Sequence, residues 1–166
     1  KPTARRYVDL LQDLFMVRQL QPWHANLGKR QVKSPKIYFR DTGLLHSLLD
    51  IPDTHALLGH PKVGASWEGF ALEQALQILH PAAAYFWGTH AGAEIDLVFQ
   101  SMGKRFGIEI KFSEAPTITP SMRIASAELS LSHLWIIYPG NQSYPVTRNM
   151  TALPLKNLPS IREQIK

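Results

Sequence analysis

The residues best suited to chemistry are Asp96, Glu109 and Lys111, which form a D-x12-E-x-K pattern around the only Glu-x-Lys triplet of the chain. Carboxylate oxygens are ligands that Mg²⁺ prefers, and protein-bound Mg²⁺ keeps several of its waters. A bound metal lowers the pKa of a water and polarises a phosphoryl oxygen, which are the two tasks of phosphodiester hydrolysis. Lys111 is placed to orient that water or to offset charge that develops on the phosphate. The pattern therefore predicts a Mg²⁺ or Mn²⁺ site on Asp96 and Glu109.

A hairpin is expected to bring the two acids together. Both lie on segments that alternate as strands do, and Met102-Gly103 is typical of the tip of a turn between them. A hairpin symmetric about this tip places Asp96 opposite Glu109, with Cβ atoms roughly 4.5–5.5 Å apart. Like charges at that distance destabilise a sheet, so we expect a positive group between them, and a divalent cation is the first candidate. The alternative is an edge hairpin with exposed charges, in which Glu94 and Lys111 form a modest cross-strand ion pair.

A further carboxylate, Glu68, is expected on a helix over residues 66–80. Helical spacing places Glu68 on the face of Leu72 and Leu79, partly buried against the sheet, where a charge needs a partner. Glu73 is expected on a different, solvated face of the helix. The alternative is that Glu68 only marks the start of the helix, where the macrodipole favours an acid.

The order of elements predicts an α/β fold. In the later part of the chain, the pattern gives helix, three strands, helix and strand over residues 66–80, 84–87, 93–99, 106–112, 120–132 and 134–138. This α-β-β-β-α-β order is typical of a mixed sheet flanked by helices. One more short strand is expected near residues 150–155. The earlier part gives a helix, an extended stretch, a basic loop, a second extended stretch and a short helix, over residues 3–16, 15–23, 26–30, 36–40 and 44–49. That order is the outline of the latter half of a winged helix.

Positive charge is concentrated near the start of the chain. Residues 1–40 hold nine Lys or Arg against two Asp, whereas residues 41–166 hold nine basic and eleven acidic residues. Such asymmetry indicates either a basic segment that faces an anion, with nucleic acid as the leading candidate, or a solvated basic face. The residues expected to contact nucleic acid are Arg5, Arg6, Lys29, Arg30 and Lys33.

The composition excludes several other kinds of site. The chain has 166 residues, 45% of them hydrophobic and none of them cysteine, so disulfides, thiolate zinc sites and cysteine nucleophiles are excluded. The seven histidines lack the paired pattern of a zinc hydrolase and are expected in loops and on the surface. No apolar run is long enough to span a bilayer, so we expect a soluble, cytoplasmic protein without a membrane partner. Because the chain opens on Lys inside a helical pattern, we expect it to be part of a longer protein.

The set of Glu68, Asp96 and Glu-x-Lys on an α-β-β-β-α-β order resembles the PD-(D/E)xK restriction-endonuclease-like superfamily. Ile95 stands where the superfamily's name has proline. More narrowly, five stretches resemble an uncharacterised C-terminal domain that follows AAA-type ATPase modules in many bacteria and archaea. These stretches appear in the family's order and lie at residues 6–11, 33–45, 67–70, 93–96 and 108–112.

This resemblance implies a restriction-endonuclease-like domain over residues 62–166, a winged-helix-like unit over residues 1–52 and a linker over residues 53–61. It implies that Asp96 and Glu109 hold the metal, that Lys111 is the catalytic lysine and that Glu68 is the supporting acid. It also implies a preceding ATPase module, which would bind ATP and act as this domain's partner.

We therefore expect metal-dependent cleavage of nucleic-acid phosphodiesters, with DNA as the leading substrate and the ATPase controlling access. The alternative is a catalytically inactive module of the same fold that binds DNA or a protein partner for the ATPase. A third possibility is a structural domain through which the ATPase assembles. Cleavage that is lost on alanine substitution of Asp96 or Lys111 would favour the nuclease, and salt-sensitive DNA binding without a metal effect would favour the binding module. A concentration-dependent oligomer without metal or DNA affinity would favour the structural domain.

Overall fold

The computed structural model describes residues 2–23 and 34–166. Its elements, in chain order, are α1 (Pro2–Asp13), β1 (Val17–Pro22), β2 (Lys36–Phe39), α2 (Thr42–Leu48), α3 (Thr54–Leu58), α4 (Val63–Leu79), β3 (Ala84–Gly88), β4 (Glu94–Ser101), β5 (Lys104–Ile110), α5 (Pro120–Glu128), β6 (His133–Tyr138), β7 (Tyr144–Thr147), β8 (Met150–Pro154), the 3₁₀ helix η1 (Leu155–Ser160) and α6 (Ile161–Gln164). Within these residues, no helix has the length and hydrophobicity needed to cross a bilayer.

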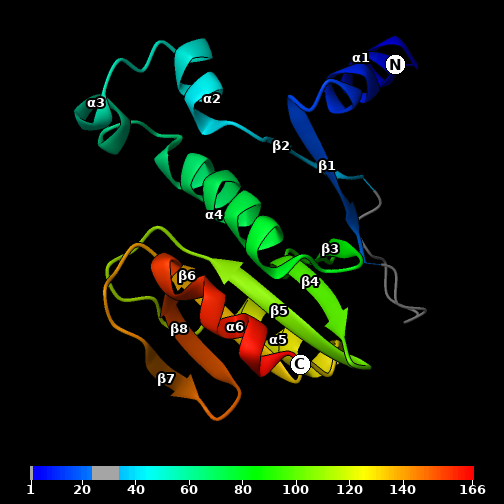
Figure 1. Ribbon diagram of the computed structural model, residues 1–166, viewed down its shortest axis with the longest axis vertical. Helices are drawn as coiled ribbons and strands as arrows, with labels where there is room; N and C mark the ends of the chain where they lie inside the picture. Colours follow the sequence, from blue (N-terminus) through cyan, green and yellow to red (C-terminus); the bar gives the residue numbers. More distant parts are fainter. Residues whose placement is uncertain (1, 24–33) are drawn as a thin grey trace.

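A mixed sheet runs through the described part of the molecule, with eight strands in the order β2-β1-β3-β4-β5-β6-β8-β7. Strands β1 and β3, β5 and β6, and β6 and β8 pair in parallel, and the other neighbours pair antiparallel. Helix α4 with η1 and α6 covers one face of the sheet, and α5 covers the other (Figure 1). The fold is thus a mixed α/β sheet with helices on both faces, as the sequence predicts at this level.

The central strands are apolar almost throughout because helices cover both of their faces. In β6, every residue from Leu134 to Tyr138 is buried, and β5 is buried from Phe106 to its end. One core, centred on Phe99, Ile108 and Trp135, lies under α4 and the C-terminal helices. The other lies under α5, on the opposite side of the same strands. These two layers fix the position of β4 and β5, which carry the candidate acids.

The predicted hairpin is confirmed. Strand β4 pairs antiparallel with β5, from Ser101 opposite Lys104 to Leu97 opposite Ile108. At the tip, Met102 and Gly103 both have positive φ, of 47° and 74°. A two-residue turn of this kind matches the twist of the flanking strands.

The first part of the chain extends the same sheet. Strands β1 and β2 form an antiparallel pair, and β1 lies parallel to β3 through Gln21 and Pro22. The expected order of helix, strand, strand and helix is present in α1, β1, β2 and α2, whereas the expected basic loop at residues 26–30 lies outside the described residues. Residues 53–61 contain the short helix α3, and β7 is a strand that the sequence pattern did not predict. The winged-helix likeness and the division into units 1–52 and 62–166 stay predictions.

Candidate functional site

The fold brings Glu68, Asp96 and Glu109 to one region from α4, β4 and β5. Asp96 and Glu109 flank the last pair of the hairpin ladder and are only 5% and 4% exposed. Beyond that pair, the backbone N–H of Ile110 donates a hydrogen bond of 2.9 Å to Oδ2 of Asp96. A side-chain oxygen of β4 thus accepts this hydrogen bond in place of a backbone carbonyl. Burial of two neighbouring carboxylates is costly unless cationic groups lie beside them.

Lys36 of β2 supplies one of those cations. Its Nζ lies 3.1 Å from Oδ1 of Asp96 and 3.2 Å from Oε1 of Glu68, and it also forms an ion pair with Glu94. The hydroxyl of Tyr38, two residues along the same strand, donates a 2.6 Å hydrogen bond to the same Glu68 oxygen. We call Glu68, Glu94, Asp96 and Glu109 the acid cluster.

Lys111 supplies the second cation. Its Nζ lies 2.6 Å from Oε1 of Glu109, and the lysine side chain is 40% exposed. The other oxygen of Glu109, Oε2, is buried and has no hydrogen-bond partner. The alternative pairing of Glu94 with Lys111 is wrong, because Glu94 pairs with Lys36 and Lys111 pairs with Glu109. Each of the two buried acids therefore has an ammonium group beside it, whereas the expected divalent cation between them stays a prediction.

The electrostatics of the cluster follow from this burial. Burial and the charge of Glu68 raise the pKa of Asp96 to about 6, although Lys36 and the Ile110 N–H favour its charged form. Burial and the charge of Asp96 raise the pKa of Glu109 to about 8, against the opposing effect of Lys111. Burial disfavours the charged form of Lys36, but the attraction of Asp96 and the other acids outweighs it, so the pKa of Lys36 is raised.

Glu68 is placed as expected, whereas Glu73 is not. The Glu68 side chain is 28% exposed and faces Lys36, in agreement with the predicted partial burial. Glu73 was expected in solvent but is 3% exposed. The β1–β2 pair covers that face of α4, where Arg18 forms two hydrogen bonds to the Glu73 carboxylate and the Nε of Arg40 lies 3.5 Å from it. The prediction was wrong because it placed no element over this face of the helix.

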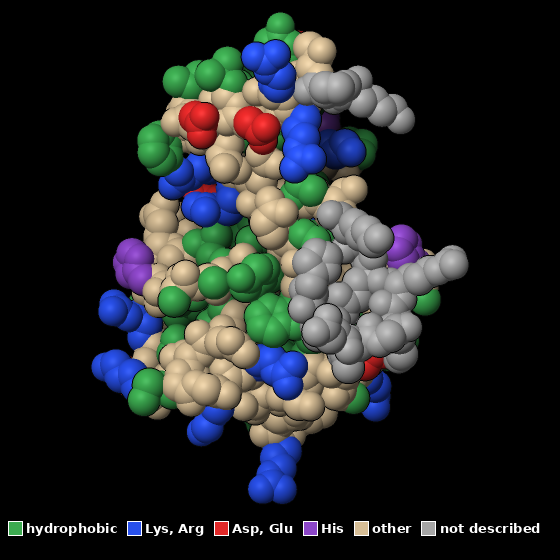
Figure 2. Space-filling model, turned by 90° about the vertical axis from the view of Figure 1, so that its right-hand side faces the viewer, with side chains coloured by type: hydrophobic (Ala, Val, Ile, Leu, Met, Phe, Trp, Pro, Cys, Tyr) green, Lys and Arg blue, Asp and Glu red, His purple; other side chains and the backbone are tan. Residues whose placement is uncertain are grey.

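The expected nucleic-acid contacts stay predictions, and the structure describes only two of the five residues. Arg5 and Arg6 are exposed on α1, and Lys29, Arg30 and Lys33 lie outside the described residues. On the face in Figure 2, Lys and Arg side chains are spread over the upper part and along the lower edge, with hydrophobic side chains gathered between them.

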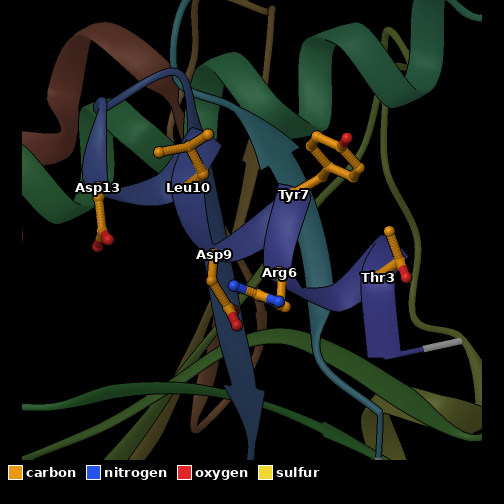
Figure 3. Close-up of a pocket in the computed structure, with 6 residues that line it drawn as sticks. All are labelled: Thr3, Arg6, Tyr7, Asp9, Leu10 and Asp13. Carbon is orange, nitrogen blue, oxygen red and sulfur yellow. The ribbon is translucent and has the colours of Figure 1, made fainter.

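Two surface hollows differ in their relation to the acid cluster. A hollow of about 600 Å³ lies along α1 and is lined by Thr3, Arg6, Tyr7, Asp9, Leu10 and Asp13 (Figure 3). All six residues come from a single helix with exposed side chains, so this hollow is an open helix face. A groove of about 480 Å³ between β2, α2 and α4 reaches the cluster, because Lys36 and Glu68 are among its lining residues. We place the candidate site at the groove and the cluster.

The histidines that the structure describes lie in no group of candidate metal ligands. His46 contacts the hydroxyl of Ser66 at 2.6 Å, and the half-buried His133 contacts the hydroxyl of Thr151 at 2.9 Å. Burial lowers the pKa of His133. Across residues 2–23 and 34–166, no three His, Asp or Glu side chains converge in an arrangement ready to hold a metal ion.

The donors of the acid cluster nevertheless suit a hard divalent cation. They are carboxylate oxygens, which Mg²⁺ and Mn²⁺ prefer. The buried Oε2 of Glu109 is a free acceptor, and Asp96 has one oxygen, Oδ1, that no backbone group uses. Lys36 already contacts Oδ1 of Asp96, and Lys111 contacts the other Glu109 oxygen, Oε1.

Sequence reasoning found the acids but missed Lys36. This lysine was placed in the basic segment and in the extended stretch 36–40, with no role at the site. One signal was available, because the alternation of a strand puts Lys36 and Tyr38 on one face. Nothing in the local sequence indicates that this face lies against the hairpin, which is far away in the sequence.

Two families match the chain. The family described as Domain of unknown function (DUF8612) matches residues 1–55, and the family described as Domain of unknown function (DUF4143) matches residues 63–158. The DUF4143 family is an AAA-ATPase-associated domain family.

Two curated proteins are similar to the chain. It is 53% identical over 152 residues to an uncharacterized protein of Mycobacterium tuberculosis, and to the same extent to an uncharacterized protein of Mycobacterium bovis. Each alignment covers 92% of this chain and 34% of the relative, so the chain spans about a third of the length of the curated relatives it matches. No solved structure matches the chain significantly.

Proposed function

The chain belongs to the DUF4143 family of domains of unknown function, and we propose that this member is a metal-dependent hydrolase of nucleic-acid phosphodiesters. One observation carries the proposal. The Oε2 of Glu109 is buried without a hydrogen-bond partner, next to a second buried carboxylate and two residues before Lys111, which follows the end of β5. An unpaired buried acceptor costs free energy, so a site that retains one is a candidate for a ligand.

Asp96 and Glu109 are the residues that would hold Mg²⁺ or Mn²⁺. When bound, such a cation supplies an acidified water and polarises the scissile phosphoryl group. Asp96 is held by the backbone N–H of Ile110, which fixes its carboxylate with Oδ1 turned away from the strand ladder. Glu109 is fixed from the other side by Lys111. The hairpin thereby presents one oxygen from each acid.

Lys111 and Glu68 have supporting roles in this proposal. The Lys111 side chain is 40% exposed, so its ammonium can reach a phosphate in solvent while its stem stays beside the end of β5. There it offsets negative charge that develops on the phosphate or orients the attacking water. Glu68 accepts hydrogen bonds from Lys36 and Tyr38, so it keeps these side chains in place at the entrance from the groove.

The basic first part of the chain and the ATPase complete the proposal. Arg5 and Arg6 are exposed cations suited to phosphate contacts, and we propose the same role for Lys29, Arg30 and Lys33. DNA is the proposed substrate, and the hairpin with its covering helices is proposed to follow the restriction-endonuclease-like arrangement. Since the relatives are about three times as long as the chain, an ATPase module within the same protein is the proposed partner that would bind ATP.

The test is cleavage of supercoiled, linear and single-stranded DNA in Mg²⁺ and in Mn²⁺. The variants are Asp96→Asn and Lys111→Met, with Glu114→Gln and Lys104→Met as exposed controls that change the charge by the same amount. We expect both site variants to lose cleavage while the controls keep it and all four retain the wild-type circular dichroism spectrum. Unchanged cleavage in both site variants would refute the proposal.

The second candidate is a module that binds DNA or protein without hydrolysis. It is favoured by the ammonium of Lys36 among the carboxylates and by the lack of converged metal ligands in the described residues. In that case DNA affinity would fall steeply with salt and would not respond to Mg²⁺ or to Asp96→Asn.

A further inference from the structure

We propose that Lys36 is the resident cation of the acid cluster, and that its ammonium and a divalent cation exclude each other from Asp96. The inference deepens the proposed metal site and rests on it. Both cations would bind the same oxygen, Oδ1 of Asp96. Metal-binding measurements alone can therefore test the proposal.

The two oxygens of Asp96 have different partners. Oδ2 accepts the hydrogen bond from Ile110, so Oδ1 is the oxygen left for a metal ion. Lys36 Nζ lies 3.1 Å from this same Oδ1. A Mg²⁺ ion bonds its oxygen ligands at about 2.0–2.1 Å, so it would sit within the space and the charge field of that ammonium.

Glu109 presents the opposite situation. Its Oε1 is paired with Lys111, and its Oε2 is buried with no partner. Of the two oxygens proposed to bind the metal ion, Oε2 of Glu109 is therefore free and Oδ1 of Asp96 is paired with Lys36. A cation that binds both carboxylates must move the Lys36 ammonium.

Several contacts hold the Lys36 side chain, but its ammonium can still move out to solvent. Glu68 and Glu94 add to its attachment, and the ring of Phe86 lies 5.6 Å from its Nζ. Its strand, β2, is the terminal strand of the sheet order and pairs only with β1 among the described residues. The Lys36 side chain also lines the groove of about 480 Å³, which gives the ammonium a path to solvent without opening the core.

This arrangement predicts how the site behaves with and without metal. Without metal, Lys36 neutralises buried carboxylates and stabilises the fold. With metal, part of the binding free energy is spent on displacing the lysine, so the wild-type site binds weakly. Removal of the ammonium should reverse both effects: lower stability in chelator and higher metal affinity.

The experiment is calorimetric titration of Mn²⁺ into the chain, with wild type, Lys36→Met and Lys104→Met compared. Lys104 lies exposed at the hairpin end, so its variant controls for the loss of one positive charge. We expect Lys36→Met to bind Mn²⁺ at least tenfold more tightly than wild type and Lys104→Met to bind as wild type does. The double variant Lys36→Met with Asp96→Asn should lose the gain. Equal or weaker binding by Lys36→Met would overturn the proposal.

A thermal scan covers the case in which Lys36→Met folds poorly in chelator. Lys36→Gln, which keeps a polar side chain, is measured beside it. Both variants should gain more in Tm from Mn²⁺ than wild type gains, and an equal or smaller gain would overturn the proposal. A tighter Mn²⁺ site without DNA cleavage would refute the proposed hydrolase and keep this inference. DNA cleavage together with unchanged Mn²⁺ affinity in the Lys36 variants would refute this inference and keep the proposed hydrolase.

Discussion

Replacing Glu109 with glutamine should stabilise the protein at alkaline pH while removing a proposed metal ligand. Glutamine keeps the shape of the side chain but carries no charge. Glu109 is 4% exposed and its Oε2 has no partner, so its ionised form is held at a cost in free energy. Residues that serve a function are often retained at such a cost in stability.

The pKa of Glu109 gives the sign and the size of the effect. Folding raises it from 4.5 to about 8. Between these values the native state binds more protons than the unfolded state, so the stability of the wild type falls as the pH rises through this window. Each pH unit between these two pKa values lowers the free energy of unfolding of the wild type by somewhat more than ~1 kcal/mol. The stability that Glu109→Gln can gain at alkaline pH therefore has an upper bound of roughly 5 kcal/mol. Coupling to Asp96 and loss of the ion pair with the 40% exposed Lys111 reduce the gain.

We expect Glu109→Gln to exceed the wild type by roughly 1–3 kcal/mol at about pH 9 and to show little or no gain at about pH 5. The assay is urea unfolding followed by tryptophan fluorescence in the presence of chelator, with the exposed Glu114→Gln as the control. Added Mn²⁺ should then raise the Tm of the wild type and leave Glu109→Gln unchanged. A glutamine variant less stable than the wild type at about pH 9 would refute this account of Glu109.

Three further perturbations test the packing and the charge of the molecule. Glu73→Ala leaves two partly exposed arginines without their buried carboxylate and should lower the free energy of unfolding by roughly 1–3 kcal/mol in urea titrations. Gly107→Ala puts a methyl group within 2.9 Å of two leucine side chains and should lower Tm, whereas Gly64→Ala meets open space on a helix and should not. Replacing Arg5 and Arg6 together with alanine should weaken DNA binding and lower the slope of log affinity against log salt by about 2, measured by fluorescence anisotropy.

Local patterns were sufficient to predict the centre of the fold. The hairpin between β4 and β5 depends on alternation and on a two-residue turn, both of which lie within a short stretch of sequence. Its register follows from the turn, and burial of one face reinforces it. The proximity of Asp96 and Glu109 was therefore predictable, and so was the partial burial of Glu68 on the face of α4 that carries Leu72.

The partners of these acids could not be predicted in the same way. They depend on the parallel pairing of β1 with β3, two strands separated by the whole of α2, α3 and α4. A parallel pairing of distant strands leaves no turn signal in the sequence. The position of Lys36 and the burial of Glu73 both follow from this β1–β3 pairing. For this reason the sequence did not reveal the role of Lys36, and the prediction of a solvated Glu73 was wrong.

Ion pairs connect the two matched segments of the chain. Glu68, Glu73 and Asp96 lie in the segment that matches DUF4143, and their cationic partners are Lys36, Arg18 and Arg40 from the segment that matches DUF8612. Each of these ion pairs joins the two segments, and Asp96 and Glu73 are almost fully buried. Without the first segment, the second would present several carboxylates with no counter-ion, at the point where a metal ion is proposed to bind. The first segment therefore contributes positive charge to a candidate site whose acids it does not contain, and it would thereby tune the metal affinity that we propose for this site.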